Sequence, residues 1–343
     1  MRMNSIRSLL AILLLIVSRS ALAMSCSDFE NQLKRTYGFR PSQLDSAAQE
    51  IKGKEMDEIW SAVQADPGSL GPCLRAALAQ PTDDNWFLFD GSQLLLSIDA
   101  SHAAKELLFQ ALSRVSLDDV DLRSWVTAAS GLGLQGFDTS ALGKRWLLYP
   151  KAEYYLPEHG AYRVDRANGA MFLFGTLDER FATSALGKLV HEGNGEVKEI
   201  AAWLLMSQAT PEALLDLSHL NTDGLSAQAV ASMKAIREKP DLIVRRAPPK
   251  TSRAEFVAAF NAVLSGDEGP FNHLVESVPD GERDLVAVAT PADLELIRKV
   301  RRYYIAKNTP HAIEYYNQFS QILMTLVWKP ESTRKQPSKN GDA

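Results

Sequence analysis

The sequence of 343 residues predicts an all-α fold, in which stacked helical hairpins are followed by a smaller C-terminal helical segment. Three observations lead to this prediction: a duplicated eight-residue segment, apolar residues spaced at helical period, and few stretches of alternating apolar and polar residues. The composition is 45% hydrophobic and 23% charged. These values are ordinary for a globular protein and exclude collagen-like and wholly disordered chains.

The first 23 residues have the pattern of an export signal. Arg2 and Arg7 precede a short apolar run, residues 9–17, and the small-x-small pattern of residues 21–23 follows. We therefore expect cleavage after Ala23 and a periplasmic or secreted protein. The run is shorter than the roughly 20 residues of a membrane-spanning helix, and no other segment reaches that length, so we expect no membrane span.

Removing this segment changes the charge. It carries three arginines and no acid, so the net charge falls from −5 to −8. Nucleic acid is not expected as a partner, because affinity for a phosphate backbone comes from basic charge.

Cys26 and Cys73 are the two cysteines of the sequence. An even pair in an exported chain predicts one disulfide, which closes a long loop and stabilises the fold by roughly 4 kcal/mol. Two buried thiols or one reactive thiol are the alternatives. Lipid attachment at Cys26 is a further alternative, although Ala23 occupies the position where a lipoprotein signal usually has leucine.

A repeat marks the middle of the chain. Residues 137–144 read FDTSALGK and residues 181–188 read FATSALGK, 44 positions later. Such a period indicates stacked supersecondary units. We expect the serines that head Ser-x-x-x-Lys frames, Ser101, Ser140 and Ser184, to cap helices.

Apolar residues follow helical spacing in these units, with glycine and proline between the runs. The clearest stripes are Ala104, Leu107, Leu108, Ala111, Leu112 and Val115, then Leu122, Trp125, Val126 and Ala129, then Val197, Ile200, Ala201, Leu204 and Leu205. Over about residues 69–240 the period and pattern resemble the HEAT-like class of α-helical repeat proteins. The resemblance implies a curved solenoid of helix pairs, used mostly to bind proteins.

The expected domain organisation follows from these patterns. After the signal peptide, a repeat domain covers residues 24–238, and an aromatic insert without helical periodicity interrupts it at 146–170. A proline-rich linker, 239–252, precedes a C-terminal helical segment, 253–328. In that segment Leu264 ends one apolar stripe, and the helix from 310 to 328 carries two apolar seams that predict burial. The polar residues 329–343 form a tail that we expect to be disordered.

The insert supplies the candidate binding residues, because insertions in solenoids tend to lie on a binding face. Its rings could stack on a sugar or peptide while its charges orient the ligand, and its histidine could act as a general base. Packing of the loop over the core is the alternative. These candidates are Tyr154, Tyr155, Glu158, His159, Tyr162 and Arg163.

A basic run near the C-terminus is the second feature of interest: Arg298, Lys299, Arg301, Arg302 and Lys307. Helical spacing places Leu294, Ile297, Val300 and Tyr304 inward, which predicts that the charges lie on a solvated face. Contact with an acidic partner or an anionic lipid surface is the alternative.

The sequence lacks the common motifs of catalytic and metal-binding sites. The sequence contains no zinc-binding His-Glu-x-x-His helix, phosphate-binding glycine loop or Gly-x-Ser-x-Gly elbow, and its histidines are scattered, so we expect no metal, cofactor or catalytic residue. The favoured function is therefore an exported helical-repeat protein that binds or scaffolds a protein or peptide. Two alternatives stay open: a cell-envelope hydrolase with its site in the insert 146–170, and an assembly protein that oligomerises through its C-terminal helices.

Overall fold

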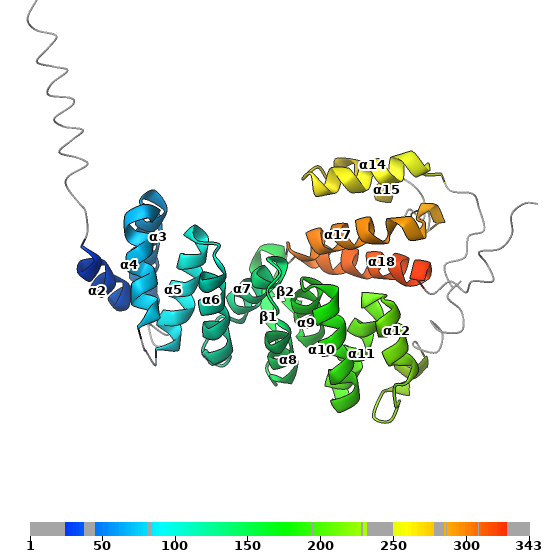
Figure 1. The fold of residues 1–343 in the computed structure, drawn as a ribbon, viewed down its shortest axis with the longest axis horizontal. Helices are drawn as coiled ribbons and strands as arrows, with labels where there is room; N and C mark the ends of the chain where they lie inside the picture. The colour runs from blue at the N-terminus through cyan, green and yellow to red at the C-terminus, as the bar shows by residue number, and fades with distance from the viewer. Residues whose placement is uncertain are drawn as a thin grey trace, which may run out of the picture. The chain divides into compact units, whose positions relative to one another are not determined.

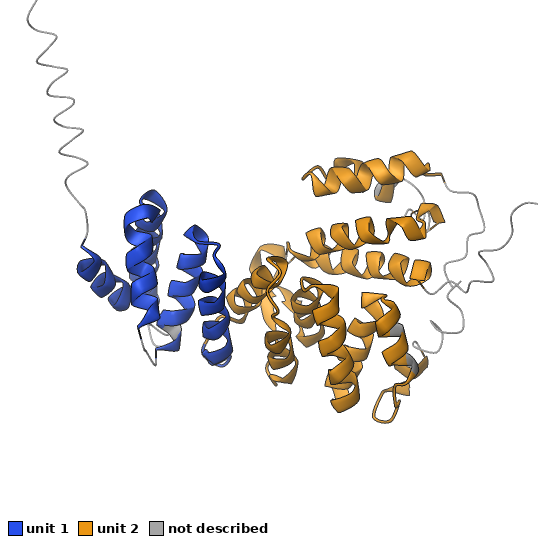
Figure 2. Cartoon of the chain, viewed as in Figure 1, with its two compact units in different colours: residues 1–119 blue, residues 120–343 orange. Residues whose placement is uncertain are grey.

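The computed structural model describes residues 25–37, 45–80, 84–193, 195–227, 229–231, 250–277, 285, 287–307 and 309–327. Within these residues the chain is mostly helical and its helices pack in pairs, which confirms the predicted helical class (Figure 1). The predicted signal peptide, the tail 329–343 and residues 239–249 of the predicted linker lie outside the described residues. Packing divides the chain into two compact units, residues 1–119 and 120–343 (Figure 2).

The first unit consists of α-helices with short connections. In chain order they are α2 (Cys26–Thr36), α3 (Ser46–Ala65), α4 (Pro67–Ala79), α5 (Asn85–Ile98) and α6 (His102–Arg114). Aspartate or serine begins several of them, because a short polar side chain can accept a hydrogen bond from the first helical turn: Asp45 caps α3, Asp66 caps α4 and Ser101 caps α6. The cap predicted at Ser101 is confirmed.

The predicted disulfide is confirmed as well. Cys26 and Cys73 are bonded, with their Cα atoms 5.2 Å apart, and the bridge joins α2 to α4. The helices beside it bury Leu33 and Leu74 completely. This bridge therefore fastens the first helix of the unit to its core.

The second unit begins with the duplicated region. Its elements are α7 (Leu122–Leu134), α8 (Ser140–Leu148), β1 (Tyr154–Leu156), the 3-10 turn η2 (Pro157–His159), β2 (Tyr162–Val164), α9 (Arg166–Gly175), α10 (Glu179–Glu192), α11 (Gly195–Gln208) and α12 (Pro211–Ser218). α8 packs on α9, and α10 packs on α11. The two strands form an antiparallel hairpin in the middle of the predicted insert, whose two ends belong to α8 and α9.

The two copies of the repeat share three buried positions. Thr139, Leu142 and Gly143 are buried in the first copy, as are Thr183, Leu186 and Gly187 in the second. The glycines allow close packing: a Cβ atom at Gly143 would lie 2.7 Å from the Phe174 ring, and one at Gly187 would meet the Asp216 carboxylate. The repeated Leu-Gly pair is therefore a helix contact.

The caps predicted at Ser140 and Ser184 are wrong. Ser140 is the first residue of α8, after the N-cap Thr139, and Ser184 lies inside α10, whose N-cap is Asp178. The Asp178 carboxylate accepts a hydrogen bond from the backbone N–H of Arg180, and α10 begins five residues earlier relative to the repeat than α8 does. Ahead of each serine an aspartate instead accepts from the start of the helix: the Asp138 carboxylate accepts a hydrogen bond from the Ser140 backbone N–H, at 3.0 Å.

The C-terminal helices belong to the same compact unit as α7 to α12. They are α14 (Arg253–Leu264), α15 (Gly269–Ser277), η4 (Pro291–Asp293), α17 (Leu294–Ile305) and α18 (Pro310–Val327). Stacked and edge-on rings of Phe256, Phe260, Phe271, Tyr304 and Phe319 fill their core. Both apolar seams of α18 are largely buried, as predicted, because one side contacts α17 and another contacts α11.

Candidate functional site

The inner side of the hairpin is part of the core. Tyr154 is 6% exposed and its ring lies 6.1 Å from the Trp146 ring, in an edge-on arrangement. Trp146 stacks in turn on Trp125, at 6.4 Å, and its indole N–H donates to the backbone carbonyl of Arg166, at 2.9 Å. Tyr154 therefore anchors the hairpin and is not presented to solvent.

The outer side of the hairpin carries an exposed ring and two ion pairs. Tyr155 is 51% exposed and lies opposite Arg163 in the strand register. The Arg163 guanidinium binds the Glu153 carboxylate at 2.6 Å. Glu158 pairs with the Arg123 guanidinium of α7, and a backbone hydrogen bond together with that guanidinium holds the pKa of Glu158 below its usual value.

The tip of the hairpin completes the set of predicted residues. His159 is exposed in η2, and it is followed by Gly160 and Ala161, which both have positive φ angles of 68° and 58°. Tyr162 is half-buried, and burial raises its pKa, helped by the nearby Asp165 and Glu314 carboxylates. The six predicted residues are thus divided between the core, two ion pairs and an exposed tip.

The prediction that the arginines of α17 lie on a solvated face is wrong. Arg301 is only 2% exposed; it donates to the backbone carbonyl of Ser207 and to the Ser320 hydroxyl, at 3.1 Å. Arg298 donates to the backbone carbonyl of Ala209, at 3.3 Å, and Arg302 to that of Thr176, at 3.0 Å. These carbonyls belong to the C-terminal ends of α11 and α9, where helix backbones have unsatisfied acceptors and a negative partial charge.

Glu179 completes this polar contact. Its carboxylate lies 2.8 Å from Arg298 Nε and 3.8 Å from the Arg301 guanidinium. Burial nevertheless raises the pKa of Glu179, against the opposing effect of the two arginines. The arginines therefore attach α17 to the helices of the duplicated region, and only part of the basic run remains for other contacts.

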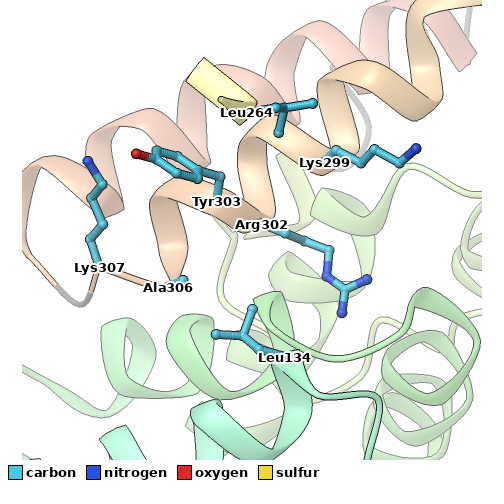
Figure 3. A pocket seen from close by; sticks show the side chains of 7 residues that line it. All are labelled: Leu134, Leu264, Lys299, Arg302, Tyr303, Ala306 and Lys307. Carbon is cyan, nitrogen blue, oxygen red and sulfur yellow. The ribbon is translucent and has the colours of Figure 1, made fainter. Parts of the chain in front are cut away.

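Lys299, Arg302 and Lys307 of the basic run line a cavity of about 500 Å³ between α17 and the ends of α7 and α14 (Figure 3). We call this cavity the α17 groove. Its lining consists of Leu134, Leu264, Lys299, Arg302, Tyr303, Ala306 and Lys307. Leu134 and Leu264 are 38% and 39% exposed, although the sequence predicted that Leu264 belongs to a core-facing stripe. The groove is thus mostly apolar with cationic groups at its edge.

Glu268 fixes one wall of the α17 groove. Its carboxylate pairs with the Lys307 ammonium and accepts a hydrogen bond from the Tyr303 hydroxyl at 3.0 Å. The Lys307 ammonium also lies over the Tyr303 ring, 4.8 Å from its centre. These interactions order Tyr303 and Lys307 in advance of any binding event.

The groove residues from other helices carried no signal in the sequence. Leu134 is far along the chain from both Leu264 and Glu268, which are themselves only four residues apart, and the packing of helix ends brings all three beside α17. Within the described residues, no group of three or more His, Cys, Asp or Glu side chains is arranged to hold a metal ion. In the same part of the chain, no helix has both the length and the hydropathy of a membrane span.

Comparison with family models, with curated proteins and with solved structures finds no match to this chain.

Proposed function

We propose that this chain is an exported, non-catalytic helical-repeat protein that binds another protein through the α17 groove. The observation that carries the proposal is the pair of exposed leucines, Leu134 and Leu264, beside ordered cationic and aromatic side chains. Protein interfaces characteristically combine apolar anchors with aromatic and arginine side chains.

The repeat supports this function. An eight-residue segment that repeats after 44 residues, with its threonine, leucine and glycine buried in both copies, suits a HEAT-like solenoid, and proteins of that class mostly bind other proteins. The export pattern of residues 1–23 and the Cys26–Cys73 bridge support an oxidising compartment outside the cytoplasm.

Site-specific photo-crosslinking tests the binding function. A photoreactive phenylalanine analogue replaces Leu264 or Ala306 in cells that naturally make the chain; matched positions are Leu148 and Leu215, which are 56% and 60% exposed outside the groove. We expect a crosslinked protein of defined mass from the two groove positions alone. Absence of such a product, or the same product from Leu148 and Leu215, contradicts the proposal.

The location is tested separately. Fractionation of the same cells should find the chain in the periplasm or the medium, and its N-terminal residue should be Met24. A chain that remains in the cytoplasm with residue 1 intact contradicts export, whatever the crosslinking shows.

A further inference from the structure

We infer that the α17 groove takes an acidic peptide segment of the partner protein, in which carboxylates flank a bulky apolar side chain. This inference rests on the proposed binding function and specifies the chemistry of the partner. It follows from the arrangement of apolar surface and positive charge in one small cavity (Figure 3).

Residues from three different helices form the apolar part of the groove. Leu134 ends α7, Leu264 ends α14, and Ala306 follows the last turn of α17. Covering two leucines that are each more than a third exposed removes apolar surface from water, which favours binding. The volume of about 500 Å³ accommodates one or two large side chains.

The positive charge available to a ligand comes from Lys299 and Arg302. They are three residues apart on α17, so both lie on one face of the helix. The Lys299 side chain is 59% exposed, and its ammonium lies 3.7 Å from Glu295, a weak exposed pair. Arg302 donates one N–H group to the Thr176 carbonyl, and its charge also acts on the Asp178 and Glu179 carboxylates; because a guanidinium has five donors, it retains donors, although not a full unpaired charge, for a ligand carboxylate.

Lys307 has a different role in the groove. Its ammonium is already neutralised by Glu268, so it forms a wall of the groove with Tyr303 and adds little attraction for an anion. The anion-binding side of the groove is therefore the Lys299–Arg302 side, next to the leucines. A ligand that contacts both this cationic side and the leucines has carboxylates adjacent to its apolar anchor.

A peptide fits these observations better than an anionic membrane. Binding to a lipid surface requires several basic groups on one face, whereas the groove offers two, in a chain of net charge −8 once residues 1–23 are removed. The cavity is also of limited volume, which suits a side chain of a folded or extended segment.

The probe is a fluorescein-labelled eight-residue peptide with a central Leu-Phe flanked by aspartate and glutamate. Its matched peptides replace every acid by the corresponding amide, or Leu-Phe by Ser-Ser. Fluorescence anisotropy with the full chain at about 50 mM salt should show saturable binding of the first peptide. Each replacement should weaken it by about tenfold, because both halves of the contact are needed.

Two pairs of variants assign the binding to the groove. Lys299→Glu should weaken binding by about tenfold, while Lys188→Glu, at an exposed position of α10, should change it by less than about twofold. Leu264→Ser should weaken binding by about fivefold, while Leu215→Ser should have no effect. Circular dichroism checks that all four variants keep the helical fold.

The outcomes separate the partner chemistry from the binding function. Failure of the acidic peptide to bind up to 1 mM, equal binding of its amide form, or equal effects of Lys299→Glu and Lys188→Glu overturns the inference. So does tighter binding to vesicles of phosphatidylglycerol than to the peptide. If photo-crosslinking at Leu264 still captures a defined protein, the binding function stands and only the chemistry of its ligand is wrong.

Discussion

The guanidinium of Arg301 lies over the ring of Tyr316, 4.9 Å from its centre. The Tyr316 hydroxyl, at the other end of the same ring, is 3.0 Å from the Ser207 hydroxyl and 3.3 Å from the Gln208 amide nitrogen. A buried polar contact therefore joins α17 and α18 to the end of α11. The C-terminal helices are held to the duplicated region by specific hydrogen bonds as well as by apolar packing.

Arg301→Met tests this contact. The substitution leaves the Ser207 carbonyl and the Ser320 hydroxyl without their buried donor, so we expect the free energy of unfolding to fall by about 3–5 kcal/mol. Urea denaturation followed by circular dichroism measures it. The control is Arg163→Met, which removes an exposed ion pair and should cost less than about 1 kcal/mol. Equal costs for the two variants would mean that Arg301 contributes nothing beyond a surface charge.

Gly143→Ala tests the repeated helix contact. The new methyl group would lie 2.7 Å from Phe174 Cζ, a buried ring, so we expect a loss of about 1–3 kcal/mol in the free energy of unfolding. Gly131→Ala in α7 is the matched control: nothing lies within 4 Å of its added Cβ, and alanine favours helix over glycine by about 0.5–1 kcal/mol. The two substitutions should therefore act in opposite directions. Stabilisation by both would show that α8 and α9 do not need the close approach.

The double substitution Cys26→Ser and Cys73→Ala tests the disulfide. Opening the loop between residues 26 and 73 should lower the free energy of unfolding of the first unit by roughly 4 kcal/mol. Thermal melting is measured with and without a reducing agent. The reducing agent should bring the parent chain close to the double variant and leave the double variant unchanged. A parent chain that melts at the same temperature in both conditions contradicts the predicted contribution.

Asp90 of α5 gives the first unit a pH-dependent stability. Burial, together with the Asp84 carboxylate, raises the pKa of Asp90 from 3.8 to about 7. The folded chain therefore keeps a proton that the unfolded chain has lost between about pH 4 and pH 7. This contribution to stability is complete below pH 4, declines as the pH rises towards 7, and is absent above it.

Asp90→Asn should remove this pH dependence. We expect the variant to gain up to about 4 kcal/mol over the parent chain at pH 8 and little at pH 4, since one pKa unit corresponds to about 1.4 kcal/mol. Glu50→Gln on the exposed face of α3 is the control and should leave the pH profile unchanged. Urea denaturation across this pH range measures both. A profile of Asp90→Asn that runs parallel to that of the parent chain would show that Asp90 is ionised in the folded state.

The helical class was predictable because apolar spacing directly reflects which face of a helix is buried. Leu108 and Leu112 in α6, Trp125 and Val126 in α7, and Leu204 in α11 are all buried where the spacing placed them. The disulfide was predictable because the chain has only one pair of cysteines. The helices can be predicted from residues close together in the sequence, and the disulfide from the fact that two cysteines allow one pairing. Neither prediction needs knowledge of tertiary packing.

The role of α17 was not predictable in the same way. Its apolar stripe placed Ile297, Val300 and Tyr304 inward correctly, but spacing alone assumes that the opposite face meets water. Here that face meets the ends of α9 and α11, and the arginines are long enough to reach their carbonyls. For the same reason the α17 groove could not be foreseen, since Leu134 and Leu264 meet α17 only through contacts between distant helices.

Both cysteines lie before residue 120, so thiol chemistry can reach only one of the two compact units. Maturation of the N-terminal unit depends on a catalyst or medium that oxidises thiols, whereas nothing in residues 120–343 can form a mixed disulfide or be trapped by one. A shift in redox potential would accordingly loosen the N-terminal helices and leave the covalent state of the groove-bearing unit untouched.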